Sequence, residues 1–135
     1  MTTNTFVNLP VKDVAKTTDF FKGLGFSFNE QFSDETTKCM VISDSSYAML
    51  HVEPVFKSFT QQDVTDTSQS REMIIGLSAD SREHVDDVVG KAVAGGGQAL
   101  GGPIDEGYMY MQAFRDLDGH QWSFIYMDMS AIPQP

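Results

Sequence analysis

The strongest constraint on the fold is the stretch 6–28, FVNLPVKDVAKTTDFFKGLGFSF. Its start, Phe6–Val11, is rich in β-branched, aromatic and apolar residues, which is typical of a strand. Asp13 follows, and its carboxylate can accept hydrogen bonds from the free N–H groups of a new helix. Apolar residues then recur at helical spacing until Gly23 and Gly25, which end the helix before a second strand begins. The chain therefore opens with a β-α-β unit.

The same pattern recurs in the second half of the chain. Shifting the numbering by 68 places Asp13 on Ser81, and the strand that begins at Phe6 on apolar residues that begin at Ile74. The pattern is repeated and the residue identities are not. A supersecondary unit that recurs at a fixed offset indicates a duplicated module.

Both halves read as β-α-β-β-β. In the first half, alternating or apolar runs predict further strands at 26–32, 38–43 and 47–52. In the second half, a strand at 72–79 precedes a helix that Asp80 or Ser81 can cap, with Glu83 placed for a capping box from Asp80. The remaining strands are predicted at 98–100, 108–115 and 120–127, with a break at 101–103 and a hairpin turn at 116–119.

A long polar segment separates the halves. It begins at Pro54, and we expect one turn of helix near Thr60–Val64. The predicted organisation is a single domain over 1–135, with module 1 at about 5–53, a connection at 54–71 and module 2 at about 72–128.

Composition narrows the classes of partner. Nine basic and nineteen acidic residues give a formal net charge of −10, which argues against nucleic acid and anionic membranes. The charge is compatible with a cationic ligand, and equally with an acidic surface that only keeps the protein in solution. No apolar run approaches the roughly 20 residues of a membrane helix. Cys39 is the only cysteine, which suits a reducing compartment, so we expect a cytoplasmic protein.

Three short motifs carry a family resemblance: VKD at the strand-to-helix step, LGF after the helix, and FRDLDG near the C-terminus. With the two modules, they resemble the vicinal oxygen chelate superfamily, which includes glyoxalase I, bleomycin-resistance proteins, fosfomycin-resistance enzymes and extradiol dioxygenases. The resemblance covers Phe6 to Met127. It implies an α+β fold in which two modules form a curled mixed-sheet cup with helices outside. It also implies a homodimer.

In metal-dependent members of this superfamily, His, Gln or Glu from two strands of each module bind a divalent metal. The resemblance places these ligand positions on Phe6, Ile74, Ser123, and Met49 or Leu50. None of these side chains supplies the usual imidazole or carboxylate. We therefore expect no cofactor, although a divalent metal is not excluded. The alternative is a pair of displaced ligands, His51 and Glu53, which otherwise read as surface residues at a strand end.

The strands can instead line a cavity for an organic ligand. A turn at 116–119 pairs Arg115 with His120, and hence Gln112 with Ser123. The predicted ligand-binding side chains are then Phe6, Asn8, Ile74, Tyr110, Gln112, Phe114, Ser123 and Ile125. A one-residue error in this register would exchange the two faces of the sheet. The competing interpretation is that both faces are core.

These observations favour a glyoxalase- and bleomycin-resistance-like protein that binds a small organic molecule in an aromatic cup without the usual metal. The alternative is a metal-dependent glyoxalase-like lyase or a dioxygenase-type enzyme with displaced ligands. A third possibility is a scaffold whose cup is filled by its own side chains. The residues assign no catalytic group, so whether the protein is an enzyme stays open at this point.

Overall fold

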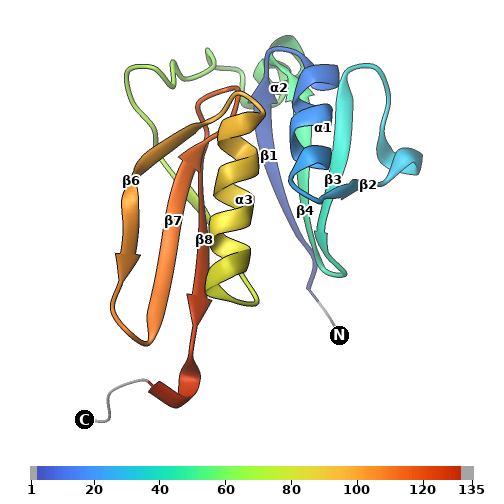
Figure 1. Ribbon diagram of the computed structural model, residues 1–135. Coiled ribbons are helices and arrows are strands. Elements are labelled where there is room, and N and C mark those ends of the chain that lie inside the picture. The colour runs from blue at the N-terminus through green and yellow to red at the C-terminus, as the bar shows by residue number, and fades with distance from the viewer. Residues whose placement is uncertain (1–2, 132–135) are drawn as a thin grey trace. The chain divides into compact units, whose positions relative to one another are not determined.

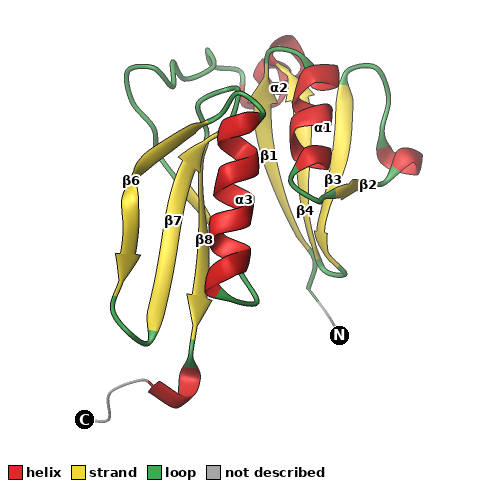
Figure 2. Cartoon of the chain, in the orientation of Figure 1, coloured by secondary structure: helices red, strands yellow, loops and turns green. Residues whose placement is uncertain are grey.

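The computed structural model describes residues 3–131, and the chain divides between Asp66 and Thr67 into two compact units (Figure 1). Each unit holds one four-stranded mixed sheet, and neither sheet closes into a barrel (Figure 2). The order of elements is β-α-β-β-β in both units, which confirms the predicted α+β class and the two modules. Within residues 3–131, no helix has the length and apolarity needed to cross a membrane.

Unit 1 contains the first sheet. Its strands are β1 (Thr5–Val11), β2 (Ser27–Phe28), β3 (Thr37–Ser43) and β4 (Ser46–Val52). They lie in the order β1-β4-β3-β2, with β1 parallel to β4 and the other pairs antiparallel. The helices are α1 (Val14–Gly23), the short 3₁₀ helix η1 (Glu30–Phe32) and α2 (Glu53–Thr60).

Helix α1 begins where the sequence predicts it. The Asp13 carboxylate accepts a hydrogen bond from Lys16 N at 3.1 Å and so caps the helix. The helix packs against β3 and β4. The core of unit 1 joins the buried face of α1 to one face of the sheet, and its members include Leu9, Val11, Phe20, Phe21, Leu24, Met40 and Leu50.

Unit 2 repeats this arrangement. Its strands are β5 (Ile74–Ser78), β6 (Gln98–Asp105), β7 (Met109–Arg115) and β8 (Gln121–Met127), in the order β5-β8-β7-β6. Helix α3 (Arg82–Ala94) packs mainly against β7, and a 3₁₀ turn, η2 (Met129–Ala131), follows β8. Its core consists of Ile75, Val85, Val88, Val89, Ala92, Phe114, Trp122 and Phe124.

Four local predictions are wrong. The connection holds α2, which ends at Thr60, in place of a helical turn at Thr60–Val64. The strand predicted at 26–32 is only β2, because Asn29 accepts a hydrogen bond from Gln31 N and starts a 3₁₀ turn. Ser81 caps α3 by accepting from His84 N, so the capping box from Asp80 does not form. β6 continues through 101–103, where a register shift absorbs the predicted break.

The predicted pairing of β7 with β8 is also wrong, by one residue. Arg115 pairs with Gln121, and Gln112 therefore pairs with Phe124 in place of Ser123. The connecting turn includes His120, whose carbonyl accepts a hydrogen bond from Asp116 N at 2.9 Å. Because the turn is one residue longer than predicted, side chains of β7 and β8 that were expected to share a face lie on opposite faces of the sheet.

Candidate ligand-binding site

The face of sheet 1 that turns away from α1 carries an aromatic and polar surface. Phe6 on β1 pairs with Tyr47 on β4, and two residues further along Asn8 pairs with Met49. Cys39 on β3 pairs with Met49 from the other side. Because directly paired residues point to the same face, these side chains lie together.

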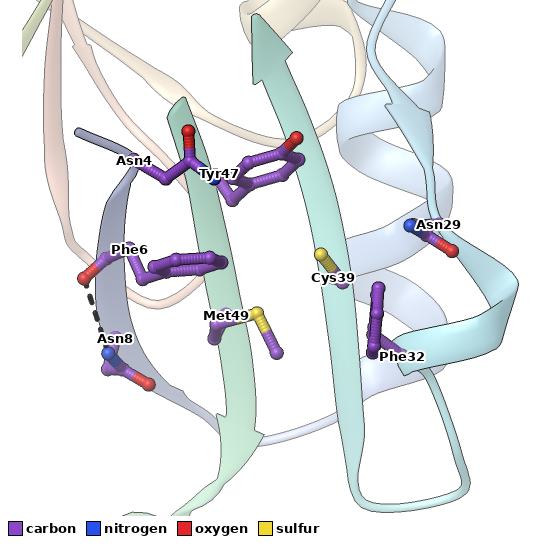
Figure 3. Close-up of a pocket in the computed structure, with 8 residues that line it drawn as sticks. All are labelled: Asn4, Phe6, Asn8, Asn29, Phe32, Cys39, Tyr47 and Met49. Carbon is purple, nitrogen blue, oxygen red and sulfur yellow. Dashed lines mark hydrogen bonds between the residues drawn. The ribbon is translucent and has the colours of Figure 1, made fainter. Parts of the chain in front are cut away.

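A pocket of about 460 Å³ lies on this face (Figure 3). Its lining side chains come from β1 and the residue before it, from β3 and β4, and from the segment around η1, and they are Asn4, Phe6, Asn8, Asn29, Phe32, Cys39, Tyr47 and Met49. None of them is charged. A mostly apolar pocket with a few polar groups is the usual form of a small-molecule site.

Two aromatic rings form one wall of the pocket. The rings of Phe6 and Tyr47 stack with centroids 5.1 Å apart and planes 15° apart. The Tyr47 hydroxyl donates to Asp44 O at 3.0 Å, which holds its ring in place. Phe6 and Phe32 are 53% and 64% exposed, so large apolar surfaces remain uncovered in unit 1. Such surfaces gain free energy when a ligand covers them.

His51 lies beside Asn8 on the same face of the sheet. The Asn8 side chain donates from Nδ2 to Phe6 O at 3.3 Å and therefore presents its Oδ1 to His51 Nε2, 2.7 Å away. Nδ1 of the same ring is 2.8 Å from the hydroxyl of Thr37. His51 is buried, and the ring of Phe59 from α2 meets it edge-on at 5.1 Å. The proton therefore lies on Nε2, and His51 fixes the orientation of the Asn8 amide.

Burial lowers the pKa of His51, and the nearby carboxylate of Asp34 opposes this effect. The imidazole is therefore neutral at neutral pH. Burial also raises the pKa of the Cys39 thiol, so the pocket presents a protonated thiol, which is a poor nucleophile.

The lowered pKa of His51 makes stability depend on pH. Because the unfolded chain binds this proton more readily, stability is greatest above the unfolded pKa and falls as the pH drops through it. We expect the melting temperature to fall more between about pH 7.5 and about pH 5.5 in the wild type than in His51→Gln. Thermal melts at both pH values measure this difference. Equal pH dependence in the two proteins would contradict the expected contribution of His51.

The side chains at the superfamily's metal-ligand positions do not fit a metal. Phe6 and Met49 line the aromatic pocket, Ile74 is a hydrocarbon, and Ser123 offers one neutral hydroxyl. Both nitrogens of His51 are engaged, and its proposed co-ligand Glu53 is the first residue of α2. Across the described residues 3–131, no group of three or more His, Cys, Asp or Glu side chains could hold a metal ion.

The eight predicted ligand-binding residues fall into three groups. Phe6 and Asn8 line the pocket of unit 1. Tyr110, Gln112 and Phe114 lie on the face of sheet 2 that α3 covers: the first two donate to Asp86 of the helix, and Phe114 is core. The other three, Ile74, Ser123 and Ile125, lie on the opposite face of that sheet. The structure therefore does not bring Tyr110, Gln112 and Phe114 together with Ser123.

Several pocket residues were missing from the prediction. Tyr47 and Met49 alternate with buried Ala48 and Leu50, and this alternation was a usable signal, because it places them on one face with His51. The positions of Asn29 and Phe32 depend on the 3₁₀ turn η1, which the alternating pattern of 26–32 concealed.

Comparison with known proteins decides the family. Residues 4–124 match the Glyoxalase/Bleomycin resistance protein/Dioxygenase superfamily. The chain belongs to this superfamily. The match spans both units and confirms the vicinal oxygen chelate resemblance of the sequence motifs. A search of curated proteins found no match.

Several solved structures share the fold. Hypothetical protein SA1046 from S. aureus is 28% identical, with a TM-score of 0.81 over 93% of this chain and 95% of that one. A glyoxalase/bleomycin resistance protein/dioxygenase family enzyme from Burkholderia phytofirmans PsJN is 16% identical, with a TM-score of 0.77 and coverages of 90% and 96%. The fosfomycin resistance protein FosX from Listeria monocytogenes is 19% identical, with a TM-score of 0.67 and coverages of 96% and 97%.

Proposed function

We propose that this protein binds a small, flat organic cation in the pocket of unit 1, without the metal that many members of the superfamily use. One observation carries the proposal: a pocket of about 460 Å³ in which stacked Phe6 and Tyr47 meet asparagine amides and no charged side chain. The residues offer binding surface and no activated nucleophile. We therefore infer a binding protein rather than an enzyme.

Three features favour a positively charged ligand. Aromatic faces attract cations through their quadrupole. The amide oxygens of Asn4, Asn8 and Asn29 can accept hydrogen bonds, although that of Asn8 already accepts from His51 Nε2 and that of Asn29 from Gln31 N. The net charge of −10 also raises the local concentration of cations around the molecule. A neutral aromatic compound would gain only the contact with the stacked rings of Phe6 and Tyr47.

The test is a fluorescence titration with proflavine, a flat three-ring cation, and with anthracene-2-carboxylate, a flat three-ring anion of similar size. We expect saturable binding of proflavine only. Phe6→Ala should weaken that binding about tenfold, because it removes a ring worth about 1–2 kcal/mol against a desolvated cation. Tyr47→Phe should retain most of the affinity, because it keeps the ring and loses only the bond to Asp44.

Ile104→Ala is the control for this series, because Ile104 is an exposed apolar residue on β6 of unit 2. Its affinity should equal that of the wild type. Equal binding of anthracene-2-carboxylate and proflavine would contradict the preference for a cation. Unchanged affinity in Phe6→Ala would contradict the site itself.

We further propose that the protein is a cytoplasmic homodimer that forms one domain with the boundaries predicted from the sequence. Exposed apolar side chains support assembly, among them Phe59, Met73 and Ile74. Sedimentation velocity at several protein concentrations should give the mass of two chains. A single 15.0 kDa species at all concentrations would contradict the dimer.

A further inference from the structure

The guanidinium of Arg115 lacks a partner within the described part of the chain. The chain's other arginines are both engaged: Arg71 donates to two backbone carbonyls, and Arg82 forms an ion pair with Asp105 at 2.8 Å. Within residues 3–131, Arg115 forms no ion pair, and its Nε is buried without a hydrogen-bond acceptor. Nineteen acidic residues are available to a chain with nine basic ones, so an unpaired, half-buried cation is unexpected.

Two glutamines flank Arg115 across the sheet. Gln98 on β6 and Gln121 on β8 both pair directly with Arg115 on β7. Directly paired side chains project to the same face, and neighbouring strands are about 4.8 Å apart. This row, Gln98–Arg115–Gln121, therefore places a guanidinium between two side-chain amides.

The row lies on the face of sheet 2 that turns away from α3. Phe114 and Trp122, which alternate with Arg115 and Gln121, are fully buried on the helix-covered face. The adjacent carboxylate of Asp116 accepts from the Trp122 indole at 3.0 Å, so it is engaged elsewhere. The row thus presents hydrogen-bond donors and no acidic group.

We propose that this row binds the carboxylate of a small organic acid. The planar guanidinium matches the two oxygens of a carboxylate, and its two terminal nitrogens form a fork of donors beside the buried Nε. The amides of Gln98 and Gln121 can donate to the same oxygens from either side. The proposal does not rest on the pocket of unit 1, because every residue in it belongs to unit 2.

The experiment observes Arg115 directly. ¹⁵N-labelled wild-type protein is titrated with sodium benzoate, which replaces sodium chloride at constant ionic strength, while the arginine Nε–Hε signals are followed by NMR. We expect a saturable shift of the Arg115 signal and none for Arg71 or Arg82. An Arg115 signal that does not move, or that moves linearly together with the other two, would overturn the proposal.

Two further measurements test which anion and which side chain are responsible for such a shift. Inorganic phosphate can also accept from a guanidinium with two of its oxygens, and tighter binding of phosphate than of benzoate would overturn the assignment to a carboxylate. Arg115→Lys should weaken benzoate binding at least about tenfold, because lysine lacks the bidentate fork. Arg82→Lys should bind benzoate like the wild type. Equal affinity in Arg115→Lys would also overturn the proposal.

Discussion

Replacing Trp122 with alanine is expected to lower the free energy of unfolding by about 3–5 kcal/mol. The side chain is fully buried in the core of unit 2, where its strand neighbour across the sheet is Phe114. Its indole N–H also donates to the buried carboxylate of Asp116 at 3.0 Å. Alanine would therefore leave a cavity and an acceptor that has lost a partner. A loss of this size is a large fraction of the stability of a typical domain.

Urea unfolding followed by far-UV circular dichroism measures this loss, because the variant lacks the chain's only tryptophan. Trp122→Phe should lose less, since one aromatic ring is kept and only the second ring with its N–H is removed. Met127→Ala on the same strand is the control, because Met127 is 45% exposed, and it should change stability by no more than about 0.5 kcal/mol. A loss below about 1 kcal/mol in Trp122→Ala would contradict the packing described for unit 2.

Gly119→Ala is the second substitution with a large expected effect. Gly119 has φ of 81°, a conformation that costs residues with a Cβ about 1–2 kcal/mol. A Cβ at this position would also overlap the side chain of Thr67, whose hydroxyl donates to Asp118 O at 2.6 Å. We therefore expect a total loss of about 2–4 kcal/mol, from backbone strain together with overpacking.

Gly101→Ala separates the two causes, because Gly101 has φ of 68° and no atom lies within 4 Å of the place that a Cβ would take there. It should show the backbone cost alone. Thr67→Gly should make Gly119→Ala less costly in a double-mutant cycle, because it removes the overlapping side chain. Equal losses for the two alanine variants would contradict the contact between Gly119 and Thr67.

The sequence was sufficient to predict the duplicated modules. The offset that places Asp13 on Ser81 identified two residues that both cap helices, each by accepting a hydrogen bond from the backbone three residues on. Helix α2 was missed although Pro54 stands in its first turn, where proline is favoured. Local sequence propensity was thus enough to predict most of the helices and strands in both units.

The site was less predictable, because it depends on register. The turn between β7 and β8 includes His120, since the Asp116 carboxylate accepts from the backbone N–H groups of Asp118 and His120. The motif alone suggested a shorter turn, and this one-residue difference moved Tyr110, Gln112 and Phe114 to the helix-covered face. In unit 1 the alternation of side chains along β1 and β4 does not depend on the length of a turn. Phe6 and Asn8 were therefore placed correctly on one face.

The most direct test of the proposed pocket uses its methionine. In protein labelled with ¹³C in the methionine methyl groups, a flat aromatic ligand in the pocket should shift the signal of Met49, which lines it. Met40 is the internal reference, because it is fully buried on the opposite face of the same sheet. We predict that proflavine shifts Met49 saturably and leaves Met40 in place. Saturable binding that leaves the Met49 signal unchanged would show that the ligand binds elsewhere.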